Sequence, residues 1–165
     1  MKKYLTEFIG TLFLVLIIGL TQNPLAIGFG LTVLVYMGAH ISGAHYNPAV
    51  SLAMFIKKEI SGVDFFKYII AQIFGAALAA YFVFTLSSNM TIQPNLDESV
   101  YQILLAEVLF TYLLVLVILN VACHPNLKDN SFYGLAIGLT VMAGAYSVGS
   151  LSGGVFNPAV SIGPS

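Results

Sequence analysis

The pentapeptide Asn47-Pro48-Ala49-Val50-Ser51 occurs again as Asn157-Pro158-Ala159-Val160-Ser161, 110 positions later (157 − 47). Two further identities keep the same offset: Leu25-Ala26-Ile27-Gly28 recurs as Leu135-Ala136-Ile137-Gly138, and Ser42-Gly43 recurs as Ser152-Gly153. A single short motif carries little weight, but agreement of several blocks at one offset indicates an internal repeat. We therefore predict one domain over residues 1–165, built from a first repeat of about 1–86 and a second of about 98–165.

Asparagine followed by proline is typical of a helix start. The asparagine side chain caps free backbone N–H groups, and proline suits the first helical turn. Each motif opens a short apolar stretch, from Pro48 to Ile56 and from Pro158 to the C-terminus. A helix needs about 20 apolar residues to cross a membrane, so both stretches are predicted to be re-entrant half-helices.

Composition places the chain in a membrane. Of its 165 residues, 58% are hydrophobic and 8% are charged, where soluble domains have roughly a quarter charged. The chain has no arginine and no lysine run longer than two, which argues against a nucleic-acid partner. The predicted fold class is an all-α membrane protein. Its five predicted spanning segments are Tyr4 to Thr21, Pro24 to Ile41, Val63 to Leu86, Val100 to Val121 and Phe132 to Val148.

Metal, cofactor and disulfide chemistry are not expected. Cys123 is the single cysteine and has no neighbouring Cys/His cluster, so it is interpreted as a packing residue. His40 and His45 are interpreted as loop-packing and hydrogen-bonding residues, because no third ligand lies at suitable spacing.

The lysines predict the orientation of the chain. All of them lie on one side of the membrane if the N-terminus is cytoplasmic, whereas the connection from Ser87 to Ser99 carries Asp97 and Glu98 on the other side. The lysines are Lys2, Lys3, Lys57, Lys58, Lys67 and Lys128. We expect an integral protein of the plasma (inner) membrane. Because each repeat has an odd number of crossings, the second repeat must be inverted relative to the first.

Inversion would bring the two half-helices together from opposite faces. Each N-terminus contributes roughly half a positive charge, and Asn47 and Asn157 would point amide N–H groups into the space between them. Such a point repels cations, and a water there must accept from both donors, so it cannot relay a proton. Irregular backbone precedes each motif, and its carbonyl groups need a water-lined pore as partner at membrane depth. The residues expected to contribute carbonyl oxygens to the pore lining are Gly43, Ala44, His45, Gly153 and Val155.

These features resemble the aquaporin (major intrinsic protein) family over essentially the whole chain. The resemblance rests on the paired Asn-Pro-Ala motifs, the stretch from His40 to His45, Ala71-Gln72-x-x-Gly75-Ala76 and Glu7-x-x-Gly10-Thr11. It implies a homotetramer of independent pores in the lipid bilayer, with passive flow of water or small neutral solutes. It also implies that Glu7, Glu107 and Gln72 support the loops from within the protein. The alternative for the two glutamates is a position near the membrane interface.

The resemblance also gives four positions for a narrow filter. Counting from the motifs, these are Ile27, Ala145, Gly154 and Val160. Strict water channels have an aromatic residue, a histidine and an arginine in this set, and none is present here. Ser161 stands where glycerol facilitators typically have aspartate. The filter is therefore expected to be wide and to pass glycerol, urea or ammonia as well as water.

The family pattern continues beyond Ser165 with a sixth spanning helix, so the sequence is expected to be a C-terminally truncated channel with five of six spanning helices. This leaves an inert channel fragment as an alternative. A secondary transporter also uses broken helices, but Glu7 and Glu107 lie near helix starts and away from the motifs. No enzyme is expected, because no nucleophile, base and orienting group converge.

Overall fold

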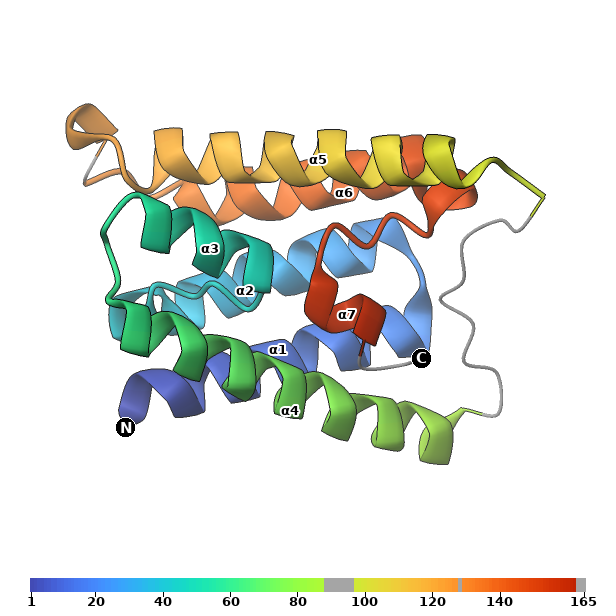
Figure 1. Cartoon of the computed structure of the whole chain (residues 1–165), viewed down its shortest axis with the longest axis horizontal. Helices are drawn as coiled ribbons and strands as arrows, with labels where there is room; N and C mark the ends of the chain where they lie inside the picture. The colour runs from blue at the N-terminus through green and yellow to red at the C-terminus, as the bar shows by residue number, and fades with distance from the viewer. Residues whose placement is uncertain (88–96, 128, 163–165) are drawn as a thin grey trace.

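The computed structural model describes residues 1–87, 97–127 and 129–162, and within these ranges the regular structure is helical (Figure 1). Five helices are long and apolar enough to cross a membrane, as the sequence predicts. These are α1 (Lys2–Thr21), α2 (Pro24–Ser42), α4 (Gly62–Leu86), α5 (Val100–Val121) and α6 (Tyr133–Ser152). Between them lie the short helices α3 (Pro48–Ile56) and α7 (Pro158–Ile162) and the 3₁₀ turn η1 (Pro125–Leu127).

The predicted ends of the helices need small corrections. Helix α1 begins at Lys2 and not at Tyr4, and α6 continues to Ser152, four residues beyond the predicted Val148. Helix α6 ends where it does because Gly153 caps it at a φ of 89°, as Gly43 caps α2 at a φ of 88°. Glycine adopts this left-handed conformation without a steric penalty. The recurring Ser-Gly pair therefore marks the end of the helix in both repeats.

Helix α1 packs along α4, and α2 packs along α6. Close approach depends on glycine. A Cβ on Gly75 of α4 would overlap the backbone carbonyl of Phe8, and a Cβ on Gly28 of α2 would come within 2.8 Å of the carbonyl oxygen of Gly138. Gly28 and Gly138 are equivalent positions of the two repeats. Small residues at such crossings are typical of membrane helix packing.

Figure 1 shows the N-terminus, the α3–α4 connection and the α5–α6 connection at one end of the bundle, called here the N-terminal end. The chain enters α5 from Asp97 and Glu98 at the opposite end. Lys128 lies outside the described residues, as does the chain after Ile162. The two half-helices lie between the α1–α4 and α5–α6 layers, with their N-termini facing each other near the middle of the bundle (Figure 1).

Candidate pore at the paired half-helices

Asn47 and Asn157 start the half-helices and also tie them together. Each side-chain oxygen accepts from the backbone two residues on: Ala49 N at 2.8 Å for Asn47, and Ala159 N at 3.1 Å for Asn157. Each side-chain nitrogen donates to the opposite loop: Asn47 Nδ2 to the carbonyl of Phe156 at 2.8 Å, and Asn157 Nδ2 to that of Tyr46 at 2.9 Å. Because an amide nitrogen carries two hydrogens, one hydrogen of each asparagine remains for the cavity that both residues line.

The loop before the first motif is held by Glu7, which has no exposed surface. Its Oε1 accepts from Ser42 Oγ at 2.6 Å and from His45 N at 3.0 Å. Its Oε2 accepts from Tyr46 N at 2.7 Å and from Gln72 Nε2 at 2.8 Å. All four hydrogen-bond partners of this carboxylate in the described part of the chain are donors, so the carboxylate fixes the loop as an acceptor.

Glu107 holds the second loop in the same pattern. It accepts from Ser152 Oγ at 2.6 Å, Val155 N at 3.2 Å and Phe156 N at 2.7 Å. Glu107 is only partly buried, whereas Glu7 is fully buried.

These bonds hold the backbone in an unusual conformation. Tyr46 and Phe156, which directly precede the two asparagines, have φ values of 49° and 48°. For a residue with a side chain, this left-handed conformation costs about 1–2 kcal/mol of conformational free energy. Each hydrogen bond to a charged group contributes about 1.5–3 kcal/mol, so the bond from each N–H to its glutamate offsets the strain. The left-handed turn directs each carbonyl to the asparagine of the opposite repeat.

The residues expected to contribute carbonyl oxygens to the pore, Gly43, Ala44, His45, Gly153 and Val155, lie in the irregular backbone before the two motifs. Buried carbonyls almost always have a partner, and all five residues line one of two cavities. Water in the cavities would complete their bonding.

The larger cavity, of about 730 Å³, extends from the paired asparagines toward the N-terminal end and is lined there by His40, Cys123 and His124. Cys123 is half-buried with its Sγ 3.8 Å from Met54 Sδ, and burial raises the pKa of its thiol. The smaller cavity, of about 240 Å³, is lined by Ile27, Ala145 and Gly154. The two cavities share Ile18, Val141 and Val155.

The structure brings together three of the four expected filter residues and leaves Val160 apart. Val160 is 1% exposed and packs in an apolar cluster with Leu12, Val15, Ala76 and Ala79. It is not among the residues that line the smaller cavity. The lining of the smaller cavity is mostly small or aliphatic, and its polar side chains are those of Gln22 and Ser150.

Several residues of this site escape sequence reasoning. The repeated Ser-Gly pair is visible in the sequence, but the bonds of the Ser42 and Ser152 hydroxyls to Glu7 and Glu107 are not. Ser51 accepts from Gln72 Nε2 at 2.9 Å and lies 3.1 Å from His45 Nδ1. The only signal for Ser51 is its place as the last residue of the repeated pentapeptide.

Comparison with known proteins gives the family to which the chain belongs. The family profile described as Major intrinsic protein matches residues 1–165. The chain is 38% identical to "Glycerol uptake facilitator protein-like 6" of Lactiplantibacillus plantarum, over 99% of this chain and 83% of that protein. It is 32% identical to "Aquaporin AqpM" of Methanothermobacter thermautotrophicus, over 99% of this chain and 82% of that protein.

A solved structure, the aquaglyceroporin from Plasmodium falciparum, has the same fold, with a TM-score of 0.86 and 23% identity over 99% of this chain and 78% of that one. The chain belongs to the major intrinsic protein family. It is an integral membrane protein of a channel family and not an enzyme.

Proposed function

We propose that this chain forms a passive pore for water and small neutral solutes, such as glycerol, urea and ammonia, and excludes cations and protons where the two motifs meet. The observation that carries the proposal is the pair of crossed bonds from Asn47 and Asn157 to the opposite loops. The bonds leave one amide hydrogen of each asparagine to face the cavity, while each side-chain oxygen is directed to the backbone N–H of its own half-helix. A water molecule there donates to neither asparagine, which breaks a proton relay.

Electrostatics supports exclusion of cations. The N-termini of α3 and α7 meet beside these asparagines, and a helix N-terminus carries roughly +0.5 of an elementary charge. No carboxylate offsets this charge within the cavity wall next to the motifs: Glu7 and Glu107 bond to the loops and do not line either cavity in the described residues. The same placement argues against an ion-coupled transporter, which needs a carboxylate in the middle of the transport path. Glu59, which also lines the larger cavity, lies in the α3–α4 connection and pairs with Lys57.

The solute range follows from the smaller cavity. Ile27, Ala145 and Gly154 offer no charge and no side-chain hydrogen bond, so these three residues select weakly by size and by bonding; the polar side chains of the same cavity are those of Gln22 and Ser150. A glycerol uptake facilitator-like protein and an aquaporin are both among the relatives, which fits a mixed permeability.

We further propose a homotetramer in the plasma membrane, with the N-terminus cytoplasmic. The described lysines lie at the N-terminal end, which agrees with the positive-inside rule. The apolar outer face of α5 suits burial against lipid or another subunit. It includes Tyr101, Leu104, Val108 and Tyr112, which are 59–72% exposed.

The test is stopped-flow swelling of proteoliposomes that contain the whole chain, with separate gradients of sucrose, glycerol and urea and a pH-sensitive dye inside. We expect water, glycerol and urea fluxes above those of protein-free vesicles, with no proton flux. Ala145→Trp should block all three by filling the smaller cavity. Ala143→Trp is the matched control, because Ala143 lies on the exposed side of the same helix. Fluxes no higher than in protein-free vesicles would favour the inert fragment.

A further inference from the structure

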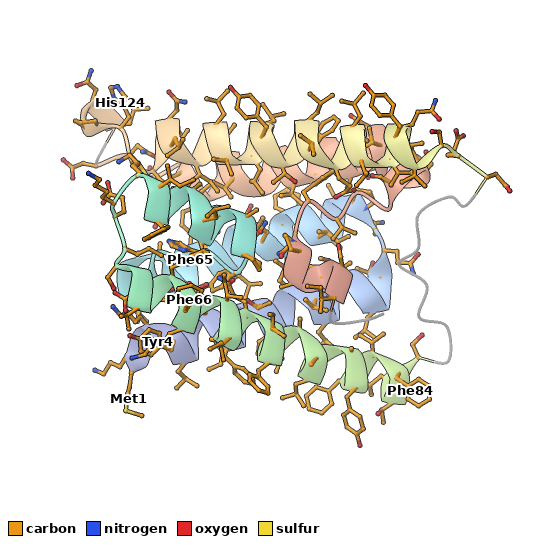
Figure 2. All side chains as sticks on the ribbon, in the orientation of Figure 1. Met1, Tyr4, Phe65, Phe66, Phe84 and His124 are labelled. Atoms are coloured by element: carbon orange, nitrogen blue, oxygen red, sulfur yellow. The ribbon has the colours of Figure 1, made fainter. Side chains whose placement is uncertain are left out.

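Cationic side chains gather where α1 and α4 begin side by side at the N-terminal end. The ammonium of Lys3 lies 5.5 Å from the ring centre of Tyr4, and that of Lys67 lies 5.2 Å from the same ring. Figure 2 shows Tyr4 and Phe66 at the same end of the bundle as Met1. Lys2 is exposed at the start of α1, one residue before Lys3.

The nearby carboxylate of Asp64 does not neutralise this group. Its Oδ1 accepts from Tyr4 Oη at 2.7 Å and pairs with Lys3 Nζ at 2.8 Å, and its Oδ2 accepts from Ser61 Oγ at 2.9 Å. Asp64 is therefore occupied by Lys3 and two hydroxyl groups. In the described part of the chain, neither Lys2 nor Lys67 forms an ion pair. Two positive charges remain at the surface.

Lys67 lies within an apolar stripe on the outside of α4. The neighbouring side chains at helical spacing are Val63, Phe66, Ile70 and Phe74, which are 62%, 66%, 54% and 65% exposed. In a membrane this stripe faces lipid. Lys67 lies five residues into α4, or roughly 7–8 Å along its axis, so its long side chain can reach the headgroup level while its stem contacts acyl chains.

We propose that this seam, defined by Tyr4, Phe66, Lys67 and Ile70, binds an anionic phospholipid. The ammonium group of Lys67 contacts the lipid phosphate, the charge of Lys2 at the start of α1 adds to the attraction, and an acyl chain lies along Phe66 and Ile70. The positive N-terminal ends of both α1 and α4 point to the same place and add to the attraction. Charge complementarity selects an anionic over a zwitterionic headgroup. The proposal does not depend on what the pore conducts.

Native mass spectrometry of the whole chain in detergent tests the site, with phosphatidylglycerol and phosphatidylcholine of the same acyl chains as probes. A basic residue near a lipid surface contributes about fivefold to affinity. Lys67→Gln should therefore lower phosphatidylglycerol retention about fivefold, and Lys67→Arg should retain it. The matched control is Lys58→Gln, because Lys58 is also exposed and has no ion pair in the described residues, but lies outside the seam.

Equal losses in Lys67→Gln and Lys58→Gln would overturn the proposal, since binding would then follow net charge alone. Equal retention of phosphatidylcholine and phosphatidylglycerol by the parent chain would also overturn it. A loss in Lys67→Arg as large as that in Lys67→Gln would show that the charge is not recognised. Unchanged helicity by circular dichroism separates each of these results from unfolding.

Discussion

The two repeats hold their re-entrant loops with the same set of bonds but at different depth. In the first repeat, Glu7 is fully buried and accepts from four donors. In the second, Glu107 is partly exposed and accepts from three. The additional donor to Glu7 is Gln72 of α4, and no helix in the described part of the second repeat covers Glu107 as α4 covers Glu7.

The different burial of the two glutamates shows that the conformation of a loop and its stability have different causes. The serine hydroxyl, the two backbone N–H groups and the left-handed residue are the same in both repeats, so the loop conformation needs only the glutamate. Burial strengthens such bonds, because a hydrogen bond to a charge is worth more at low dielectric and costs more when it is lost. The first loop should therefore be the more stable of the two.

The largest difference in stability between the two repeats is expected when the glutamate loses its charge. Glu7→Gln places an amide nitrogen against two donors in a dry site and removes two hydrogen bonds to a charge. It should lower the free energy of unfolding by about 3–5 kcal/mol. Glu107→Gln should cost about 1–2 kcal/mol, because water can reach the group. Unfolding in mixed detergent followed by circular dichroism measures both.

The exposed Glu98→Gln is the control and should change little. Equal costs for Glu7→Gln and Glu107→Gln would contradict the comparison, because they would mean that burial by α4 adds nothing.

A smaller loss of stability is expected on replacing Gln72, the donor to Glu7 that has no counterpart at Glu107. Gln72→Leu removes the bonds to Glu7 and Ser51 at 2.8 and 2.9 Å and leaves buried groups less satisfied, at a cost of about 2 kcal/mol. In a Glu7→Gln background the same change should cost much less, because its main partner has already been altered. Additive costs in this double-mutant cycle would show that Gln72 acts through packing alone. Asn120→Leu, at an exposed amide, controls for the change in polarity.

Sequence predicted the fold well, because helix length, hydrophobicity and an exact repeat are local signals. The five spanning helices and the two half-helices follow from them. The crossed bonds of Asn47 and Asn157 could not be predicted, since they depend on the left-handed turns at Tyr46 and Phe156, where no glycine marks the turn. The different burial of Glu7 and Glu107 could not be predicted either. Both glutamates lie near the start of a spanning helix, and only the packing of α4 over Glu7 distinguishes them.

The filter region offers a third comparison, between equivalent valines. Val160 packs with α1 and α4 in an apolar cluster, against which Val155 of the smaller cavity also packs, and Val50 lines the larger cavity. An arginine at 160 cannot keep its charge in the apolar cluster, so it should turn toward the smaller cavity and lower glycerol flux severalfold more than water flux. Val50→Arg should change the ratio of glycerol to water flux less, because the larger cavity has about 730 Å³. Stopped-flow swelling with both solutes gives the ratio, and an equal change for the two variants would contradict a solute filter at the smaller cavity.

The smallest difference between the repeats is expected at the asparagines. Asn47 and Asn157 make matching caps and matching crossed bonds. Asn47→Asp and Asn157→Asp should each put a carboxylate beside the two half-helix N-termini, cancel part of their positive charge and turn a donor toward the opposite carbonyl into an acceptor. Both variants should leak cations, and to a similar extent. A potassium gradient with a voltage-sensitive dye in proteoliposomes measures the leak.

Asn47→Ser and Asn157→Ser, which keep a capping hydroxyl without the charge, separate the effect of charge from that of a loosened loop. A leak confined to one aspartate variant would mean that the two motifs do not share the barrier, and a leak as large in the serine variants would assign it to loop geometry.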